Sequence, residues 1–255
     1  MQLNYKKLGD SGNHLIILHG LLGSLDNWHT IAKQLAENHQ VYIVDQRNHG
    51  RSPHTDEINY GLLANDMIEF CAQQHISKCH IIGHSMGGKV AMVLALTQPE
   101  LIEKLIVVDI APTFYDGGHE DILFAMAEAP LKMATKRDEI DLYLQNRIRD
   151  FGVRQFILKN LSRDENGQFI WKCNFISLIK NYRLLMDFPK IEMAFLGNTY
   201  FIKGENSNYI NPDNFDACDK YFPKNKLIEI KNAGHWVHAD NPLEFTEKLK
   251  QILLD

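Results

Sequence analysis

Short apolar runs alternate with longer stretches of helical spacing over the first 110 residues. Short apolar runs are typical of strands that are buried on both faces of a parallel sheet. Strands are predicted at residues 14–18, 41–44, 78–82 and 104–108, with an edge strand at 3–8; helices are predicted at 60–75, at 89–96 and, capped by Asp26, through Trp28, Ile31, Leu35 and Ala36. This alternation predicts an α/β fold with a doubly wound, mostly parallel sheet and helices on both of its faces.

The alternation stops between residues 111 and 190, where helical patterns dominate. This stretch is too long for a simple connection and has its own periodicity. Residues 1–110 and 191–255 are therefore predicted to form the core, with 111–190 as a helical cap inserted over the strand ends. Predicted cap helices span 120–128, 137–149, 153–161 and 175–187, with a hairpin turn at 164–167; the core resumes with strands at 200–203 and 227–230 and helices at 212–221 and 242–253.

The pattern Gly83-x-Ser85-x-Gly87 lies between a predicted strand and a predicted helix. A G-x-S-x-G sequence in that context is typical of a nucleophile elbow, a sharp turn that lifts a serine hydroxyl above the end of a sheet. Glycines flank such a serine because the strained turn brings neighbouring backbone close. The adjacent helix N-terminus stabilises developing negative charge. We therefore interpret Ser85 as a catalytic nucleophile.

A glycine-rich loop, residues 19–24, follows the first central strand. In hydrolases with an elbow of this kind, such a loop supplies one oxyanion-hole amide and the residue after the nucleophile supplies the other. Here those amides belong to Leu21 and Met86. His19 is interpreted as a structural histidine that fixes the loop. Residues 45–53 are predicted to form a polar loop that satisfies its own hydrogen bonds.

A serine nucleophile needs a base, and the base needs an acid. His235 follows the last predicted strand and fits the chain order of serine, acid and histidine. His238 is the rival, interpreted as a loop or surface histidine. Asp109 ends the strand after the nucleophile's strand–helix unit and is the preferred acid. Glu205 is the second candidate and Asp213 a distant third.

Composition narrows the range of partners and compartments. The formal net charge of -5 gives no basic surface for a nucleic acid. No apolar run approaches the ~20 residues of a membrane span, and the N-terminus lacks the apolar region of a signal peptide. Cys71, Cys79, Cys173 and Cys218 show no C-x-x-C spacing and fit reduced thiols, so a cytoplasmic protein is expected. The histidines lack zinc-binding spacing, so a metal site is not expected.

Taken together, these motifs resemble the α/β-hydrolase superfamily, and more narrowly the YbfF-type esterases. The resemblance covers nearly the whole chain and rests on residues 19–24 with 27–28, 45–52, 83–89, 107–112, 201–207 and 233–236. It implies a cofactor-free serine esterase that acts on small-molecule carboxylic esters of small to medium acyl chains, with acyl-CoA thioesters as further candidates. It also implies that the acid follows the strand after the nucleophile, which supports Asp109.

The substrate pocket is expected to depend on the cap. The cap is expected to roof an acyl pocket, and five apolar side chains are candidates for its lining: Phe114, Phe124, Trp171, Phe175 and Leu185. A haloalkane dehalogenase would need a carboxylate at the position of Ser85. A carbon–carbon bond hydrolase uses the same Ser-His-Asp set and is separated from an esterase only by its substrates. A non-catalytic binding protein of this fold would lose a member of that set.

Overall fold

The computed structural model describes residues 1–118 and 120–254. In these residues the main sheet has seven strands in the order β1-β3-β2-β4-β5-β8-β9. β1 runs antiparallel to β3 at one edge, and the other neighbouring strands run parallel. The strands are β1 (Tyr5–Leu8), β2 (Asn13–Leu18), β3 (His39–Val44), β4 (Cys79–His84), β5 (Ile102–Val108), β8 (Asn198–Gly204) and β9 (Asn225–Ile230). The predicted doubly wound, mostly parallel sheet is confirmed.

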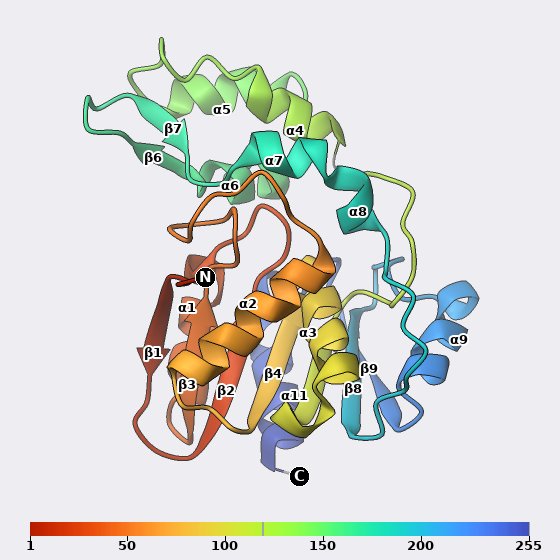
Figure 1. Cartoon of the computed structure of the whole chain (residues 1–255). Helices are drawn as coiled ribbons and strands as arrows, with labels where there is room; N and C mark the ends of the chain where they lie inside the picture. Colours follow the sequence, from red (N-terminus) through yellow and green to blue (C-terminus); the bar gives the residue numbers. More distant parts are fainter. Residues whose placement is uncertain (119, 255) are drawn as a thin grey trace.

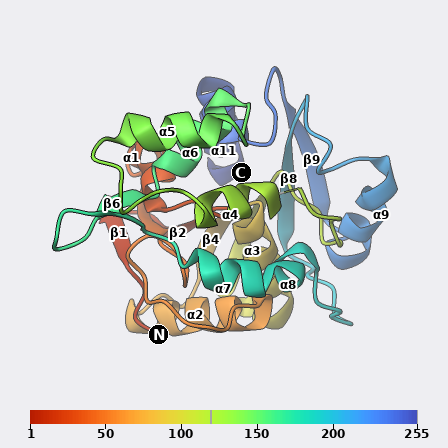
Figure 2. The ribbon, with the colours of Figure 1, turned by 90° about the horizontal axis from the view of Figure 1, so that it is seen from above.

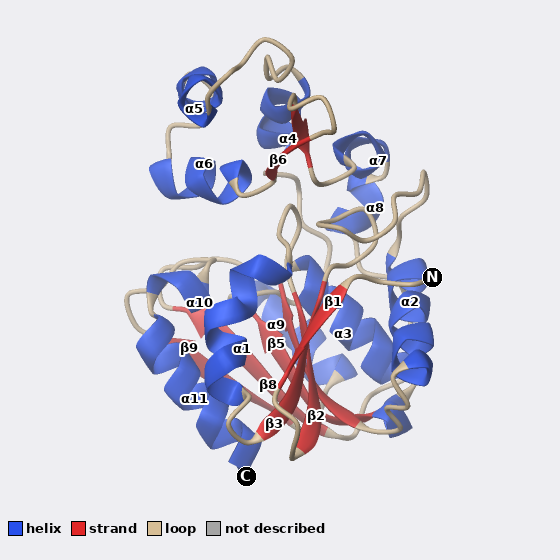
Figure 3. Ribbon diagram, turned by 90° about the vertical axis from the view of Figure 1, so that its left-hand side faces the viewer, coloured by secondary structure: helices blue, strands red, loops and turns tan. Residues whose placement is uncertain are grey.

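Helices cover both faces of this sheet (Figures 1 and 3). α1 (His29–Leu35) and α11 (Pro242–Leu254) lie on one face, and α2 (Tyr60–Gln73) and α3 (Met86–Thr97) lie on the other. Side chains along β2 alternate between the two faces, because successive residues of a strand point to opposite sides. Leu15 and Ile17 join the apolar cluster under α1 and α11, whereas Ile16 and Leu18 join the cluster under α2 and α3. The central strands therefore read as continuous apolar runs.

Residues 111–190 lie between β5 and β8 and sit above the carboxyl ends of the strands (Figures 1 and 3). Seen from above, their helices spread across the top of the sheet (Figure 2). The boundaries of this cap stay a prediction, and we call it segment 111–190. Its elements are α4 (Glu120–Ala127), α5 (Arg137–Gln145), α6 (Phe151–Leu158), β6 (Leu161–Arg163), β7 (Phe169–Trp171), α7 (Phe175–Lys180) and α8 (Tyr182–Met186). β6 and β7 pair antiparallel, as the turn at 164–167 predicts.

The remaining helices are α9 (Pro212–Tyr221) and α10 (Val237–Asp240), which flank β9 in the chain. α9 places Cys218 in the same apolar cluster as α3. None of the helices formed by the described residues has both the length and the apolar character that crossing a lipid bilayer requires.

Four predicted helices differ from the structure. The helix predicted at 153–161 spans Phe151–Leu158 instead, and Leu161 belongs to β6. Asp26 lies inside a short 3-10 turn, residues 25–28, rather than capping a helix, because the Asn27 side chain accepts from the Ser24 backbone N–H at 2.7 Å and tightens the chain there. The helix predicted at 137–149 ends at Gln145. The helix predicted at 175–187 breaks at Asn181, whose side-chain amide donates to the Ser177 carbonyl at 2.9 Å and competes with the helical backbone.

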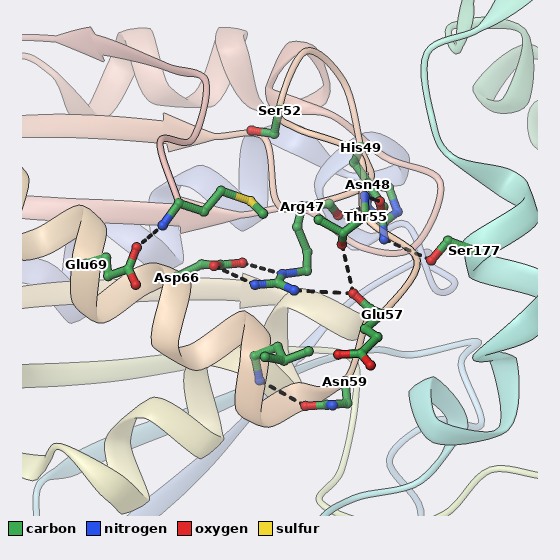
Figure 4. A network of polar contacts seen from close by, with 12 residues as sticks. Arg47, Asn48, His49, Ser52, Thr55, Glu57, Asn59, Asp66, Glu69 and Ser177 are labelled. Atoms are coloured by element: carbon green, nitrogen blue, oxygen red, sulfur yellow. Dashed lines mark hydrogen bonds and ion pairs between the residues drawn. The ribbon is translucent and has the colours of Figure 1, made fainter.

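A polar loop, residues 45–57, follows β3 and contacts segment 111–190 (Figure 4). Arg47 donates to both carboxylate oxygens of Asp66 on α2, at 2.5 and 2.7 Å, and both side chains are buried. The Asn48 side chain accepts from Thr55 N–H at 2.7 Å and donates to Ser177 Oγ on α7 at 3.1 Å. The loop thus satisfies part of its polar groups itself and part through α2 and α7, whereas the buried Gln46 Oε1 has no hydrogen-bond partner among the residues that the structure describes.

Candidate active site

Ser85 occupies the turn between β4 and α3. Its φ of 52° and ψ of −119° lie in a region that side-chain-bearing residues rarely adopt. The turn is tight, because a Cβ on Gly83 would lie 2.2 Å from the Gly87 carbonyl oxygen. α3 begins at Met86, so the amide of that residue lies at the positive end of the helix. The strand–turn–helix context that the sequence predicts is present.

The glycine loop after β2 lies against Ser85. A Cβ on Gly20 would lie 2.9 Å from His84 Nδ1 and 3.2 Å from Ser85 Cβ, so any larger residue would push these neighbours aside. Two buried imidazoles hold the loop: His19 Nε2 accepts from Gln46 N–H at 3.1 Å, and His49 Nε2 accepts from Leu22 N–H at 3.2 Å. His19 is therefore a structural histidine, as predicted. Leu21 lies beside Ser85 in this fixed loop.

The imidazole of His235 meets a buried carboxylate. His235 Nδ1 lies 2.8 Å from Asp109 Oδ2. Asp109 follows β5 with a φ of 54°, and its N–H donates to the Ile202 carbonyl of β8 at 2.8 Å. Parallel strands place their carboxyl ends at one edge, which brings these residues together across 126 positions of sequence. When Nδ1 carries the ring proton, Nε2 is the ring nitrogen that can accept a proton.

Asp109 is fully buried, and its carboxylate is held by two further donors. Gly204 N–H donates to Oδ1 at 3.1 Å, and the Ser207 hydroxyl donates to Oδ2. Desolvation raises the pKa of Asp109 to about 7, while the hydroxyl of Ser207 and the N–H of Gly204 oppose that rise. Low local polarity also strengthens the attraction between this carboxylate and an imidazolium at 2.8 Å.

Aromatic rings surround His235. Tyr209 stacks on its imidazole, with 3.8 Å between ring centroids. The backbone carbonyl of His235 contacts His84 Nε2 at 2.8 Å. His238 was predicted to be a loop or surface histidine, and that prediction is wrong: it is only 8% exposed and stacks on Trp28 at 4.3 Å, because α10 turns it into the core.

The rival acids have other contacts. Glu205 Oε2 accepts from Asn232 N–H at 2.8 Å and braces the loop that carries His235. Asp213 is exposed in the first turn of α9. Of the three candidate acids, Asp109 is the one whose carboxylate meets the imidazole.

Comparison with known proteins supplies the family. The chain matches the family described as alpha/beta hydrolase fold over residues 13–129. It is 38% identical to the sn-1-specific diacylglycerol lipase ABHD11 of Danio rerio, over 96% of this chain and 79% of that protein. It is 34% identical to the esterase YbfF of Escherichia coli strain K12, over the full length of both. The chain belongs to the α/β-hydrolase family.

A solved structure extends this family relationship to three dimensions. A marine microorganism esterase superposes with a TM-score of 0.96 at 42% identity, covering 98% of each chain. The resemblance to the α/β hydrolases that the sequence motifs indicate is thereby confirmed, as is the resemblance to the YbfF esterase.

Two pockets of this α/β hydrolase meet at Ser85, and both are also lined by Leu21. The first contains His235, and we call it the histidine-side pocket. The second contains Lys89, and we call it the lysine-side pocket. Further walls of the histidine-side pocket are Ile122, Val153, Phe156, Ile157 and Trp236. Further walls of the lysine-side pocket are Tyr60, Met86, Tyr115, Leu185, Met186 and Tyr209.

The five apolar side chains proposed for the acyl pocket occupy different places. Leu185 lines the lysine-side pocket. Phe114 lines a separate surface hollow and is 47% exposed, and Phe124 is 52% exposed. Trp171 is buried and donates to the Met126 carbonyl at 2.9 Å. Phe175 packs partly buried against the core.

Sequence reasoning missed Lys89, which lies one helical turn after Ser85. Its ammonium is buried and donates to the carbonyls of Thr113, Met186 and Asp187 at 2.8, 2.8 and 2.9 Å. Desolvation lowers the pKa of Lys89 to about 7. The only sequence signal is a lysine inside an otherwise apolar helix, which is unusual unless the charge is paired. Ser207 and Tyr209 were missed as contacts of Asp109 and His235.

No group of three or more His, Cys, Asp or Glu side chains that could hold a metal ion occurs within residues 1–118 and 120–254.

Proposed function

We propose that this α/β hydrolase is a carboxylic ester hydrolase in which Ser85, His235 and Asp109 form a catalytic triad. The observation that carries the proposal is the 2.8 Å contact between His235 Nδ1 and Asp109 Oδ2, with that imidazole in the same pocket as a serine at a left-handed elbow. Relatives named as esterases and lipases support ester hydrolysis.

The reaction proceeds by two acyl transfers. Ser85 Oγ attacks the carbonyl carbon while His235 takes the hydroxyl proton. The amides of Leu21 and Met86 bind the oxyanion, a role in which each donor is worth about 3 kcal/mol. His235 then gives its proton to the departing alkoxide as the carbon–oxygen bond breaks. Water, activated by the same imidazole, hydrolyses the acyl-serine and restores the enzyme.

Hydrolysis of a short-chain p-nitrophenyl ester tests the scheme. Ser85→Ala is expected to abolish turnover, and Asp109→Asn to lower kcat by about 10^4 because the imidazole loses its correct tautomer. Glu205→Gln is the matched control. It removes a carboxylate whose Oε2 accepts from Asn232 N–H, in the loop that carries His235, and does not contact the imidazole. Full activity in Ser85→Ala would refute the proposal, and a larger loss in Glu205→Gln would transfer the acid role.

A labelling probe and a comparison of substrates test two rival functions. A fluorophosphonate probe is expected to label the wild type and not Ser85→Ala; an unlabelled wild type would favour a non-catalytic binding protein. Acyl-CoA thioesters, diacylglycerols and carbon–carbon bond substrates are compared with simple esters by kcat/KM, which ranks the transition states that the site stabilises. Preference for carbon–carbon cleavage would contradict an ester hydrolase.

A further inference from the structure

The two pockets that meet at Ser85 differ in their relation to the proposed base. His235 lines the histidine-side pocket together with Trp236, whereas the lysine-side pocket is lined instead by Tyr209, whose ring stacks on that imidazole. Ser85 and Leu21 line both. A tetrahedral intermediate at Ser85 can therefore extend one substituent into each pocket while its oxyanion stays near the amide of Leu21.

The proton pathway fixes which substituent goes where. The imidazole that takes the serine proton must return it to the leaving oxygen or sulfur, so that atom has to lie within hydrogen-bond reach of the imidazole. The leaving group therefore lies on the side of His235. The acyl chain is attached to the same carbon and has to point away from the imidazole, toward α3 and Lys89.

The lysine-side pocket suits an uncharged group. Lys89 has three N–H donors, and the carbonyls of Thr113, Met186 and Asp187 accept from the ammonium. Its Nζ also lies 4.8 Å from the ring centroid of Tyr115. The ammonium of Lys89 therefore has no donor left over for a substrate carboxylate, and most of the other lining side chains offer methylene or aromatic surface. The enclosed cavity of this pocket is narrow, about 20 Å³, which limits the length of the chain.

Segment 111–190 contributes four apolar side chains to the histidine-side pocket, and the core contributes the other lining residues. Ile122 comes from α4, and Val153, Phe156 and Ile157 come from α6. These four side chains are apolar, and the enclosed cavity is narrow, about 30 Å³. An apolar alcohol or thiol fits such walls better than a charged one.

We propose that the ester binds with its short, uncharged acyl chain in the lysine-side pocket and its apolar leaving group in the histidine-side pocket. This inference rests on the proposed function. Met186 and Val153 then determine specificity separately, the first for the acyl chain and the second for the leaving group. Both side chains are partly exposed pocket walls that pack against the core, so a larger residue at either position reduces the space in its own pocket.

Two substrate series separate the pockets. One series holds the alcohol fixed as methanol and lengthens the acyl chain from acetyl to octanoyl; the other holds acetyl fixed and lengthens the alcohol over the same range. Met186→Trp is expected to lower kcat/KM for the longer acyl chains about tenfold or more relative to acetyl and to leave the slope of the alcohol series unchanged. Val153→Trp is expected to do the reverse.

Controls and contrary outcomes complete the design. Leu184→Trp and Phe151→Trp place the same ring on neighbouring, largely exposed positions and are expected to change neither slope. Met186→Ala enlarges the lysine-side pocket and should favour longer acyl chains, and Val153→Ala enlarges the histidine-side pocket and should favour longer alcohols. These two variants test the same assignment if a tryptophan variant fails to fold. Swapped or shared effects would overturn the pocket assignment while Ser85-dependent ester cleavage persists. Absence of Ser85-dependent cleavage would defeat the proposed function itself.

Discussion

At the scale of single residues, the carboxylate of Asp109 depends on its neighbours for its charge. Ser207 and Gly204 donate to it, and hydrogen bonds to a charged form lower a pKa. Burial acts in the opposite direction. Ser207 is thus a positioning residue for the proposed acid, since the structure gives it no role in bond making.

Ser207→Ala is predicted to raise the pKa of Asp109, because burial remains and one stabilising donor is lost. The acidic limb of the kcat/KM profile should move to higher pH, and kcat at pH 7 should fall. Ser207→Thr keeps a hydroxyl and is expected to restore most of the wild-type profile. A loss of kcat with an unshifted pH profile would contradict this role and would indicate a packing defect.

The two imidazoles that hold the glycine loop predict acid sensitivity. Burial lowers the pKa of His19 to about 4 and that of His49 to about 3. Between those values and the unfolded pKa of about 6.5, the unfolded chain binds more protons. The stability from these neutral imidazoles is therefore complete above pH 6.5 and is lost as pH falls toward 4.

Urea midpoints measured between pH 7.5 and 4 test this prediction. The free energy of unfolding should fall by up to about 1.4 kcal/mol per pH unit for each proton taken up. His49→Gln is expected to lower the stability at pH 7.5 and to flatten the slope below pH 6.5. An unchanged slope in that variant would show that His49 is not a source of the acid sensitivity.

Sequence reasoning points most directly to those candidate residues whose surroundings are local. Ser85 is proposed because its glycines and the strand–helix change lie within a few residues. Asp109 required a choice among three carboxylates, since its contact to His235 spans 126 residues. Lys89 was missed because its three carbonyl partners, 24 to 98 residues away, leave no local pattern.

At the scale of elements, Asn48 connects the polar loop to segment 111–190. It is fully buried, with a φ of 63°. Its side chain contacts Thr55 and Ser177, and its carbonyl accepts from Asn174 N–H at 2.8 Å. Asparagine tolerates this left-handed backbone better than most residues.

Asn48→Gly is predicted to lower the free energy of unfolding by about 1–3 kcal/mol, because buried groups lose their partners while the backbone stays relaxed. Asn48→Ala adds a strained backbone and should cost about 1 kcal/mol more. Urea denaturation of the two variants measures both quantities. Equal stabilities would show that the left-handed backbone costs nothing here.

Element boundaries were the weaker part of the sequence analysis. The break at Asn181 comes from one side-chain amide and leaves the apolar periodicity intact, so periodicity alone predicts one helix. The helix at 212–221, by contrast, was predicted with its observed ends, because Asn211 and Pro212 are strong start signals.

At the scale of the whole molecule, the sheet separates two apolar clusters. The cluster under α2 and α3 continues into segment 111–190, whereas the cluster under α1 and α11 contains core residues alone. The fold class could be predicted because continuous apolar strands require both clusters. The strand order could not, since the sequence does not state which strands become neighbours.

Leu249→Ala is predicted to destabilise the protein by about 2–5 kcal/mol and to leave kcat of the folded enzyme unchanged, because Leu249 is fully buried in the cluster that segment 111–190 does not reach. Leu254→Ala, on the same helix but 79% exposed, should stay within about 0.5 kcal/mol of wild type. Thermal unfolding followed by circular dichroism, with kcat measured at low temperature, tests both. A reduced kcat in Leu249→Ala would contradict the separation.

The ammonium of Lys89 ties the two ends of segment 111–190 together. It donates to the Thr113 carbonyl, where the chain leaves the sheet, and to the Met186 and Asp187 carbonyls, where the chain returns. Separating these two chain segments would leave the buried ammonium of Lys89 without carbonyl partners, which is costly. Lys89 also lies on α3, the helix that begins directly after Ser85, so one helix carries both the proposed nucleophile and the cation that holds the two ends of the segment together.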